Sequence, residues 1–440
     1  MDLRVRFRKI LLGGLLMLVF MASLVYVIPG RHTYRKARPE QSNAAIETYQ
    51  EVQQVKWPLT NAQLTVQHTT TANHVSTARD HAEQDQSPAP KEEITSGPQG
   101  HLLSKIVLIF AYLRSGSTFT ASLFTQLPDS FYVFEPLHAL TDAIGKDGVL
   151  RYINGSVRHF PYGIEEQPDW LYREAIEHWF RCRLGHLDTA SLQDDFHEQY
   201  SMKSMKPFLL CVRHKRASNL SAETAIKECL PPTEKKCRDA HLRVFKTIRL
   251  SMETVWDLLR LFDNMKVIFL VRDPRGMFVS QGRNYLIKPG KNVAQFQKIC
   301  TKMNADLNVA SRILADGNKN VHLVRYEDIA FNPFTAVEQL YAFIGEPLTN
   351  AVKSYVKLST SLNIKDSCAF CTLRGNSSAT ATKWRHEIKP IFLRIADKYC
   401  RTVYDQLGYY PTLDLSYLRN DSLPLQANTI PLLDNTVIQK

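Results

Sequence analysis

Five short apolar runs recur along the chain after residue 104, and each has the length of a buried β-strand. They cover residues 105–111, 131–134, 244–248, 266–271 and 321–325. Continuous apolar runs are typical of strands that are covered on both faces of a parallel sheet, whereas half-exposed strands alternate between apolar and polar residues. Stretches compatible with helices separate these runs within the folded domain expected over residues 102–415, and this alternation is compatible with an α/β domain that has a central parallel sheet.

A longer apolar segment lies near the N-terminus. Residues 10–28 contain no charged side chain, and at about 1.5 Å of rise per residue a helix of this length nearly spans the hydrocarbon core of a membrane. The competing interpretation is a cleaved signal peptide, whose apolar region is normally shorter. We therefore expect an uncleaved transmembrane anchor with residues 1–9 as a cytoplasmic tail. Basic residues flank the segment evenly, so the positive-inside rule does not decide its orientation. Nearly all of the chain follows the anchor, and a type II orientation would place this part in the lumen.

Polar composition marks two further segments. Residues 29–101 are rich in Gln, Thr, Ser, Ala, His and Pro, and they show neither a helical nor a strand period. Such a composition buries too little apolar surface to offset the entropy of the chain, so we expect a disordered luminal stem. The final residues, 416–440, are expected to form a poorly ordered tail.

Charge, cysteines and sequons narrow the setting in which the chain works. The formal net charge of +12 favours acidic partners, without separating nucleic acid, anionic lipid, nucleotide and acidic polysaccharide. Of the eight cysteines, only Cys368 and Cys371 have the spacing of a zinc half-site, so disulfides of unassigned connectivity are favoured over zinc in a luminal chain. Asn-x-Ser sequons agree with that location and begin at Asn154, Asn219, Asn376 and Asn420.

The first apolar run leads directly into a loop of small and hydroxylated residues. Residues 112–120 read TyrLeuArgSerGlySerThrPheThr, and a stretch compatible with a helix follows at 121–126. A strand, a small-residue loop and a helix in this order direct backbone N–H groups and the positive end of the helix toward one point, which suits a phosphate or sulfate. Gly116 permits a close approach of the backbone. The GxxxxGK[ST] pattern is absent, and an ordinary strand-to-helix turn is the alternative.

The fourth apolar run leads into a second loop of this kind. Residues 272–280 read ArgAspProArgGlyMetPheValSer, in which Asp273 can cap a helix and Pro274 suits its first turn. Arg272 stands at the exit of the strand, and Ser280 follows two helical turns later, so both side chains could bind one phosphate. The alternative is a surface arginine near the start of a helix.

Together the two loops resemble the donor-binding motifs of sulfotransferases. Residues 112–119 are similar to the loop that holds the 5′-phosphosulfate of 3′-phosphoadenylyl sulfate (PAPS), and ArgAspProArg followed by Ser280 is similar to the 3′-phosphate motif. The resemblance covers about 102–412. The first loop departs from the commonest family pattern, because it reads SerGlySerThrPheThr where ThrGlySerSerPheVal is frequent. Further segments resemble the Golgi carbohydrate 6-O-sulfotransferases that act on galactose, N-acetylglucosamine or N-acetylgalactosamine, and lie at 131–138, 244–250, 323–330 and 384–385.

The resemblance implies a P-loop-like sulfotransferase fold and an enzyme that needs PAPS but no metal. It implies a Golgi membrane location and a glycan or glycosaminoglycan acceptor, of chondroitin or keratan type, that is sulfated on a 6-hydroxyl. Nucleic acid is not an expected partner, and a homodimer is left open. The implied donor-binding residues are Arg114, Ser115, Gly116, Ser117, Thr118, Phe119, Thr120, Arg272, Asp273, Pro274, Arg275 and Ser280.

Two catalytic roles are expected from these residues. Arg114 should stabilise the charge that develops on the leaving phosphate, because a guanidinium stays charged and is a poor proton donor. Glu135 is the first candidate for the base that takes the acceptor proton, and His138 is the second. The alternative for Glu135 is a carboxylate that orders its loop or binds acceptor hydroxyls.

Other polar residues of the similar segments carry less definite expectations. Arg249 and Arg385 are candidates for contacts with the nucleotide or an acidic acceptor, and equally for structural salt bridges. The neighbours Glu327 and Asp328 are expected to act as a scaffold pair near the end of a strand.

Three other functions account for part of the sequence. A Golgi glycosyltransferase would share the anchor and the stem, but no two aspartates here have the Asp-x-Asp spacing that many such enzymes use for a metal. A non-enzymatic glycan-binding protein would use the positive charge and leave the two loops unexplained. A nucleic-acid binder is disfavoured by the anchor, the cysteines and the sequons.

Overall fold

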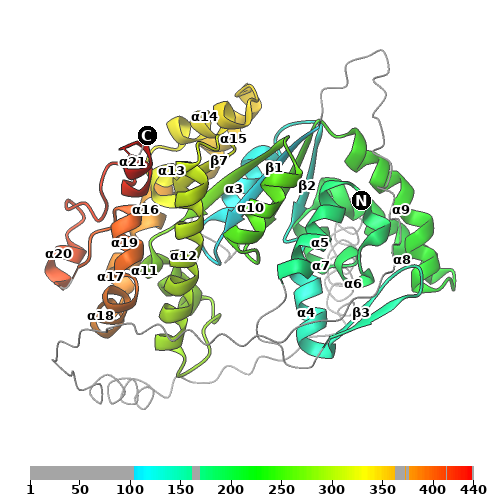
Figure 1. The fold of residues 1–440 in the computed structure, drawn as a ribbon, viewed down its shortest axis with the longest axis horizontal. Coiled ribbons are helices and arrows are strands. Elements are labelled where there is room, and N and C mark those ends of the chain that lie inside the picture. Colours follow the sequence, from blue (N-terminus) through cyan, green and yellow to red (C-terminus); the bar gives the residue numbers. More distant parts are fainter. Residues whose placement is uncertain (1–103, 161–168, 362–371, 373–375, 413, 439–440) are drawn as a thin grey trace, which may run out of the picture. The chain divides into compact units, whose positions relative to one another are not determined.

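A five-stranded sheet forms the centre of the protein in the computed structural model, which describes residues 104–160, 169–361, 372, 376–412 and 414–438. All five apolar runs form strands of this sheet, as predicted (Figure 1). The strands are β1 (Lys105–Ala111), β2 (Ser130–Phe134), β5 (Leu242–Thr247), β6 (Met265–Val271) and β7 (Val321–Arg325).

The strands lie in the order β2-β5-β1-β6-β7, and every neighbouring pair is parallel. The first strand therefore occupies the middle, where Val107 is opposite Val244 on one side and Lys266 on the other. Because the strands are parallel, all five carboxyl ends lie at one edge of the sheet, where open α/β sheets bind their ligands.

Helices cover both faces of the sheet, which explains why the strand sequences are continuously apolar. Ile106, Leu108 and Phe110 of β1 pack on one face, and Val107 and Ile109 pack on the other. The first face is covered by α5 (Asp169–Phe180), α10 (Met252–Leu261) and α12 (Asn292–Ala315). The second is covered by α3 (Ser117–Phe124), α14 (Pro333–Ile344) and α15 (Asn350–Thr360).

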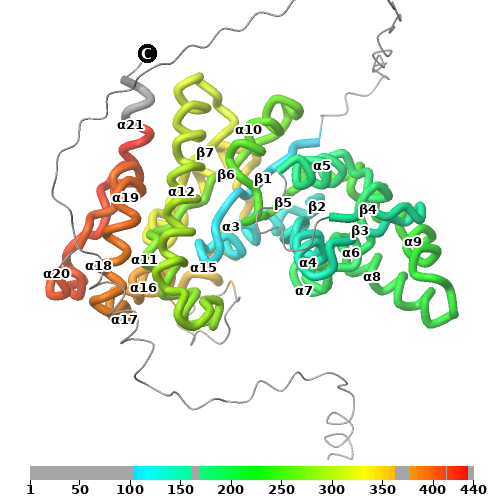
Figure 2. The backbone as a smooth tube through the Cα atoms, turned by 60° about the horizontal axis from the view of Figure 1, so that its bottom comes forward, coloured from blue at the N-terminus to red at the C-terminus, as the bar shows by residue number. Residues whose placement is uncertain are grey.

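The open edge of strand β2 is covered by the segment that begins α8. Its Tyr132 and Phe134 N–H groups donate hydrogen bonds to the hydroxyls of Ser204 (2.8 Å) and Ser201 (2.9 Å), so these backbone donors are not left open. A group of helices gathers on this side (Figure 2). It comprises α4 (His138–Asp147), α5, α6 (Thr189–Leu192), α7 (Asp195–Tyr200), α8 (Met202–Ala217) and α9 (Ala222–Asp239).

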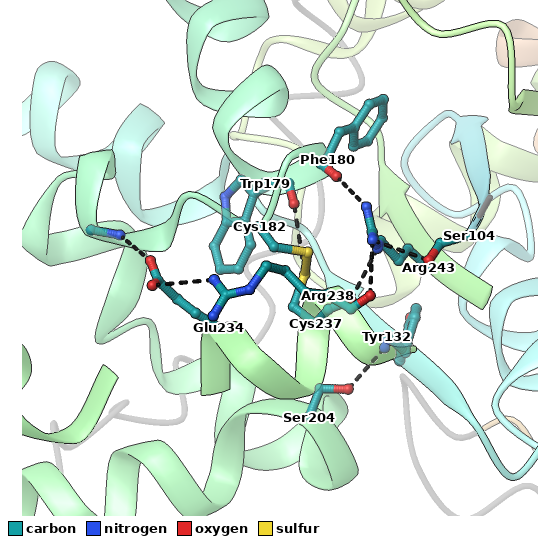
Figure 3. The surroundings of a disulfide bond; sticks show 11 residues. Ser104, Tyr132, Trp179, Phe180, Cys182, Ser204, Glu234, Cys237, Arg238 and Arg243 are labelled. Carbon is teal, nitrogen blue, oxygen red and sulfur yellow. Dashed lines mark hydrogen bonds and ion pairs between the residues drawn. A yellow bond between two sulfur atoms is a disulfide. The ribbon is translucent and has the colours of Figure 1, made fainter. Parts of the chain in front are cut away.

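Among the described residues, three disulfides join separate elements of the fold. They join Cys182 to Cys237, Cys211 to Cys229 and Cys300 to Cys400. Figure 3 shows the first, which links the chain after α5 to α9 next to Arg243; that guanidinium donates to the carbonyls of Phe180 and Cys237, both at 2.9 Å. Cys368 and Cys371 lie outside the described residues.

The tail expected over residues 416–440 is wrong for the part that the structure describes. Two helices, α20 (Leu415–Arg419) and α21 (Pro431–Ile438), lie there, and Leu418, Ile430 and Leu432 are buried. The guanidinium of Arg385 fixes the connecting backbone by donating to the Leu418 carbonyl at 2.6 Å, among others. This settles Arg385 as a structural residue. Isolated apolar residues give no periodicity, so the sequence did not indicate this packing.

The expected anchor, residues 10–28, and the expected stem, residues 29–101, both lie outside the described residues. In the described part of the chain, no helix has the length and apolar character needed to cross a membrane. The asparagines of the sequons, Asn154, Asn219, Asn376 and Asn420, are all exposed.

Candidate functional site

A cavity of about 650 Å³ opens at the carboxyl edge of the sheet. Residues just beyond the ends of all five strands line it: Arg114 follows β1, Glu135 follows β2, Arg249 follows β5, Arg272 follows β6 and Tyr326 follows β7. Convergence at this edge is a consequence of the parallel topology, since each chain segment must leave its strand there. Both loops that were predicted from the sequence as candidate anion sites therefore line this cavity.

The N-terminus of α3 forms one wall of the cavity. Gly116, the N-cap residue, has a φ of 89° and makes no side-chain cap, and Ser117, Thr118 and Phe119 follow it into the cavity wall. The first N–H groups of a helix have no partner within the helix, and they lie at its positive end. This wall can therefore bind an anionic group through backbone donors, as predicted for the first loop.

Gly116 is required by a close contact as well as by its backbone angle. A Cβ atom there would lie 2.2 Å from Cδ2 of Tyr326. We expect Gly116→Ala to lower the free energy of unfolding by about 1–3 kcal/mol more than Gly290→Ala and to weaken the binding of an anion at this wall. Gly290 is the matched control, because its φ is also positive, at 74°, and an added Cβ would meet nothing within 4 Å. Equal effects of the two substitutions, measured by thermal melting, would contradict the steric explanation.

The two predicted anion loops meet in space. The Nε atom of Arg114 donates to the hydroxyl of Ser280 at 3.0 Å, and Nη1 of Arg272 donates to the carbonyl of Arg114 at 2.9 Å. Arg114 has a φ of 69°, a left-handed conformation that is costly for a residue with a side chain. The loops after β1 and β6 thus form one continuous basic wall.

Arg272 is a buried cation with unused hydrogen-bonding capacity. Its side chain is 9% exposed and lies over the ring of Tyr326 at 4.5 Å. Its Nε–H donates no hydrogen bond to any of the described residues, and Oε1 of Glu327 stands 3.9 Å away. A buried donor without a partner is costly, and an anion in the cavity would supply one. The arrangement therefore fits a phosphate group at the position expected for the second loop.

Glu327 holds the backbone of this second loop in place through hydrogen bonds, as expected for a scaffold residue. Its two carboxyl oxygens accept hydrogen bonds from the Asp273 N–H at 3.1 Å and from the Tyr409 hydroxyl at 2.8 Å. Burial raises its pKa to about 7, against the opposing effect of Arg272. Its neighbour Asp328 pairs with Arg325 at 2.8 Å.

Several residues of the two motifs do not line the cavity. Ser115 and Thr120 are fully buried, and their hydroxyls donate to the carbonyls of Tyr112 and Gly116 within the loop. Pro274 opens α11 (Pro274–Arg283), which Asp273 caps by accepting from an N–H. These residues shape the loops and do not line the cavity.

Arg275 corrects the sequence-based assignment most clearly. Its side chain is wholly buried and pairs with Asp273 at 2.7 Å, and it donates to the Tyr410 carbonyl at 2.9 Å. Burial lowers its pKa, but Asp273 more than offsets this, so the pKa is raised and the guanidinium stays charged. Arg275 therefore joins α11 to the C-terminal segment and does not line the cavity.

Glu135 lies at the end of β2 between two cations. Its Oε1 pairs with Nζ of Lys246 and its Oε2 pairs with Nη1 of Arg249, while the residue itself is 2% exposed. It has a φ of 50°, so the backbone here is also strained. The contacts favour the alternative in which this carboxylate orders its surroundings. They also give Arg249, which lines the cavity, a salt bridge to Glu135.

Sequence reasoning missed Lys246. This residue lies on β5, is 4% exposed, lines the cavity and stands 4.5 Å from the ring centre of Phe134. Burial lowers its pKa, although Glu135 opposes that change. The available signal was a charged residue inside an otherwise apolar strand, which is rare unless it is paired.

Aromatic side chains form the part of the cavity wall beside the end of β2. Phe134 stacks on Tyr200 with ring centres 4.5 Å apart, and Phe196 stacks on His138 at 4.1 Å. Phe196 and Tyr200 belong to α7, in a stretch without any recognised motif, so the sequence gave no signal for them. Their apolar ring faces could hold a flat, partly apolar ligand.

Comparisons with known proteins found similar sequences and similar folds. The family described as Sulfotransferase domain matches residues 104–408. Carbohydrate sulfotransferase 1 of Rattus norvegicus is 28% identical over 353 residues, covering 72% of this chain and 82% of the relative. Carbohydrate sulfotransferase 3 of Homo sapiens is 24% identical, covering 75% and 71%. The solved sulfotransferase domain of the Synechococcus PCC 7002 olefin synthase is 17% identical and covers 68% of this chain and 96% of its own, with a TM-score of 0.35.

Proposed function

This chain belongs to the sulfotransferase domain family and is a PAPS-dependent enzyme, and we propose that it transfers sulfate from PAPS to a hydroxyl group of a glycan. The observation that carries the proposal is the junction of the two loops, in which Arg114 contacts Ser280 at 3.0 Å beside the buried Nε of Arg272. PAPS carries two anionic groups, the 5′-phosphosulfate and the 3′-phosphate, on one nucleoside. A cavity in which two anion-binding loops meet matches such a donor.

The described residues fit this donor. The N-terminus of α3 with Arg114 would hold the 5′-phosphosulfate, and Arg272 with Ser280 would hold the 3′-phosphate. Bound PAPS supplies an activated sulfuryl group and a phosphate leaving group. Arg114 and Lys246 place fixed positive charge beside that group, where a low-dielectric site makes charge stabilisation most effective.

The acceptor that we propose is a chondroitin- or keratan-type chain, sulfated at the 6-hydroxyl of galactose, N-acetylglucosamine or N-acetylgalactosamine. Two relatives named as carbohydrate sulfotransferases support a sugar acceptor. The aromatic part of the cavity wall offers ring faces for a pyranose, and Lys383 among the lining residues offers a cation to an acidic polymer.

We propose a Golgi membrane location with a type II anchor at residues 10–28. Three disulfides and four exposed sequons support an oxidising, glycosylating compartment. Expression of the full chain in cultured cells, followed by Golgi co-staining and glycosidase digestion, tests this. A chain that stays in the cytosol without glycans would overturn the location while leaving the activity open.

The activity itself is tested by incubating the full chain with radiolabelled PAPS and a panel of unsulfated chondroitin and keratan chains. We expect label in at least one glycan, stoichiometric formation of the by-product PAP, and carbon NMR shifts at C6 of the modified sugar. Absence of label from every glycan, together with no binding of PAP, would refute the proposed function. Label at another carbon would refute only the 6-hydroxyl assignment.

A further inference from the structure

A base is needed to take the proton of the acceptor hydroxyl, and Glu135 is poorly placed for this. Both of its carboxylate oxygens are engaged, one by Lys246 and the other by Arg249. Taking up a proton would break one of these buried ion pairs, and a broken pair leaves an uncompensated charge. The geometry therefore directs attention to other titratable groups of the same cavity wall.

His138 is such a group, and it is held from two sides. Its Nδ1 lies 2.9 Å from Oδ2 of Asp194, and its ring stacks on Phe196 with centres 4.1 Å and planes 20° apart. The side chain lines the cavity and is 25% exposed, so it can reach both an acceptor and solvent. Two fixed contacts of this kind set the orientation of an imidazole, as a catalytic base requires.

Asp194 is itself fixed, and it determines the tautomer of His138. Its carboxylate caps α7 by accepting from the Phe196 N–H at 2.9 Å, and Oδ2 also accepts from the Ala139 N–H at 3.2 Å. Burial alone would raise the pKa of Asp194, but the hydrogen bonds from His138 and Phe196 hold it below its usual value. An ionised carboxylate only accepts hydrogen bonds, so Nδ1 of a neutral His138 carries the proton.

We propose that His138 is the general base of the reaction, with Nε2 as the proton acceptor and Asp194 as the positioning residue. This inference rests on the proposed sulfate transfer. With Nδ1 protonated, Nε2 is the free lone pair, and within the described residues no hydrogen bond to Nε2 is found. The pair lies where β2 ends and α7 begins, beside the aromatic part of the cavity wall.

The proposed step balances in protons and electrons. The hydroxyl proton of the acceptor passes to Nε2 of His138 while the acceptor oxygen bonds to sulfur. The bond between sulfur and the bridging phosphate oxygen breaks, and its electron pair stays on the phosphate of PAP. The imidazolium that forms is stabilised by the negative charge of Asp194, and it returns its proton to solvent through the exposed part of the ring.

His138→Ala and Asp194→Asn, each made in the full chain, test the proposal. With radiolabelled PAPS and the chondroitin or keratan chain that wild type labels fastest, we expect kcat to fall about 100- to 10,000-fold in His138→Ala. PAP affinity should stay within about twofold, and added imidazole should restore transfer in a concentration-dependent way. In Asp194→Asn the cap of α7 is kept, but the amide N–H faces Nδ1 and drives the proton onto Nε2. We therefore expect a large loss of kcat with little change in KM and no rescue by imidazole.

His214→Ala, an exposed position on α8, is the matched control and should leave transfer unchanged. The proposal is overturned if His138→Ala keeps its kcat within about threefold of wild type. It is also overturned if activity, PAP binding and melting temperature all fall together without imidazole rescue, since that is the signature of a structural histidine. If wild type itself labels no glycan, the proposed function fails first, so the two failures are distinguishable.

Discussion

Replacing Arg275 with methionine is expected to lower the free energy of unfolding by about 3–5 kcal/mol. Arg275 is wholly buried, pairs with Asp273 at 2.7 Å and lies over the rings of Trp384 (4.9 Å) and Tyr404 (4.7 Å). Methionine keeps much of the apolar volume but leaves Asp273, itself 2% exposed, without its cation. The measurement is urea denaturation followed by circular dichroism.

Arg272→Ala is the matched control for this substitution, because it removes the other arginine of the same motif. Arg272 faces the cavity with a buried Nε that has no hydrogen bond among the described residues. Its loss should weaken PAP binding roughly 10- to 100-fold, as expected for lost charge-assisted hydrogen bonds, with a much smaller effect on unfolding. If Arg275→Met instead weakened PAP binding without destabilising the protein, the separation of the two roles would be wrong.

These two arginines show where the sequence stops being informative. Both stand in one four-residue motif, and their spacing does not say which side chain faces the donor. That depends on α11 packing against residues after 384, and the contact from Arg275 to Tyr410 spans 135 positions. Local sequence patterns do not reveal a contact between residues so far apart in the chain. For the same reason they did not predict the burial of Leu418, Ile430 and Leu432.

The strands and both anion loops were predictable because their signals are local. An apolar run of strand length followed by small or basic residues defines each of them within about 15 positions. The order of the strands was not predictable, since β1 pairs with β5 and β6, which lie more than 130 positions later. The residues of the two loops were therefore recognisable in the sequence, whereas Lys246, Asp194, Phe196 and Tyr200 are brought to the cavity only by the fold.

Glu135→Gln is expected to destabilise the protein by about 3–5 kcal/mol, because Lys246 and Arg249 would then share a buried wall without their common anion. Unfolding in urea measures this loss. The double variant Glu135→Gln with Lys246→Met removes one of the two unpaired cations, so it should recover part of the stability. An unchanged or further reduced stability in the double variant would contradict the ion-pair explanation.

The same variant decides the chemical role of Glu135. At a temperature well below its melting transition, Glu135→Gln should keep measurable sulfate transfer and PAP binding, because the carboxylate positions Lys246 and Arg249 and does not take the acceptor proton. A folded Glu135→Gln protein that binds PAP normally but transfers sulfate at less than about a thousandth of the wild-type rate would identify Glu135 as the base. If Glu135→Gln still transfers sulfate and His138→Ala does not, the proton acceptor is His138 and not Glu135.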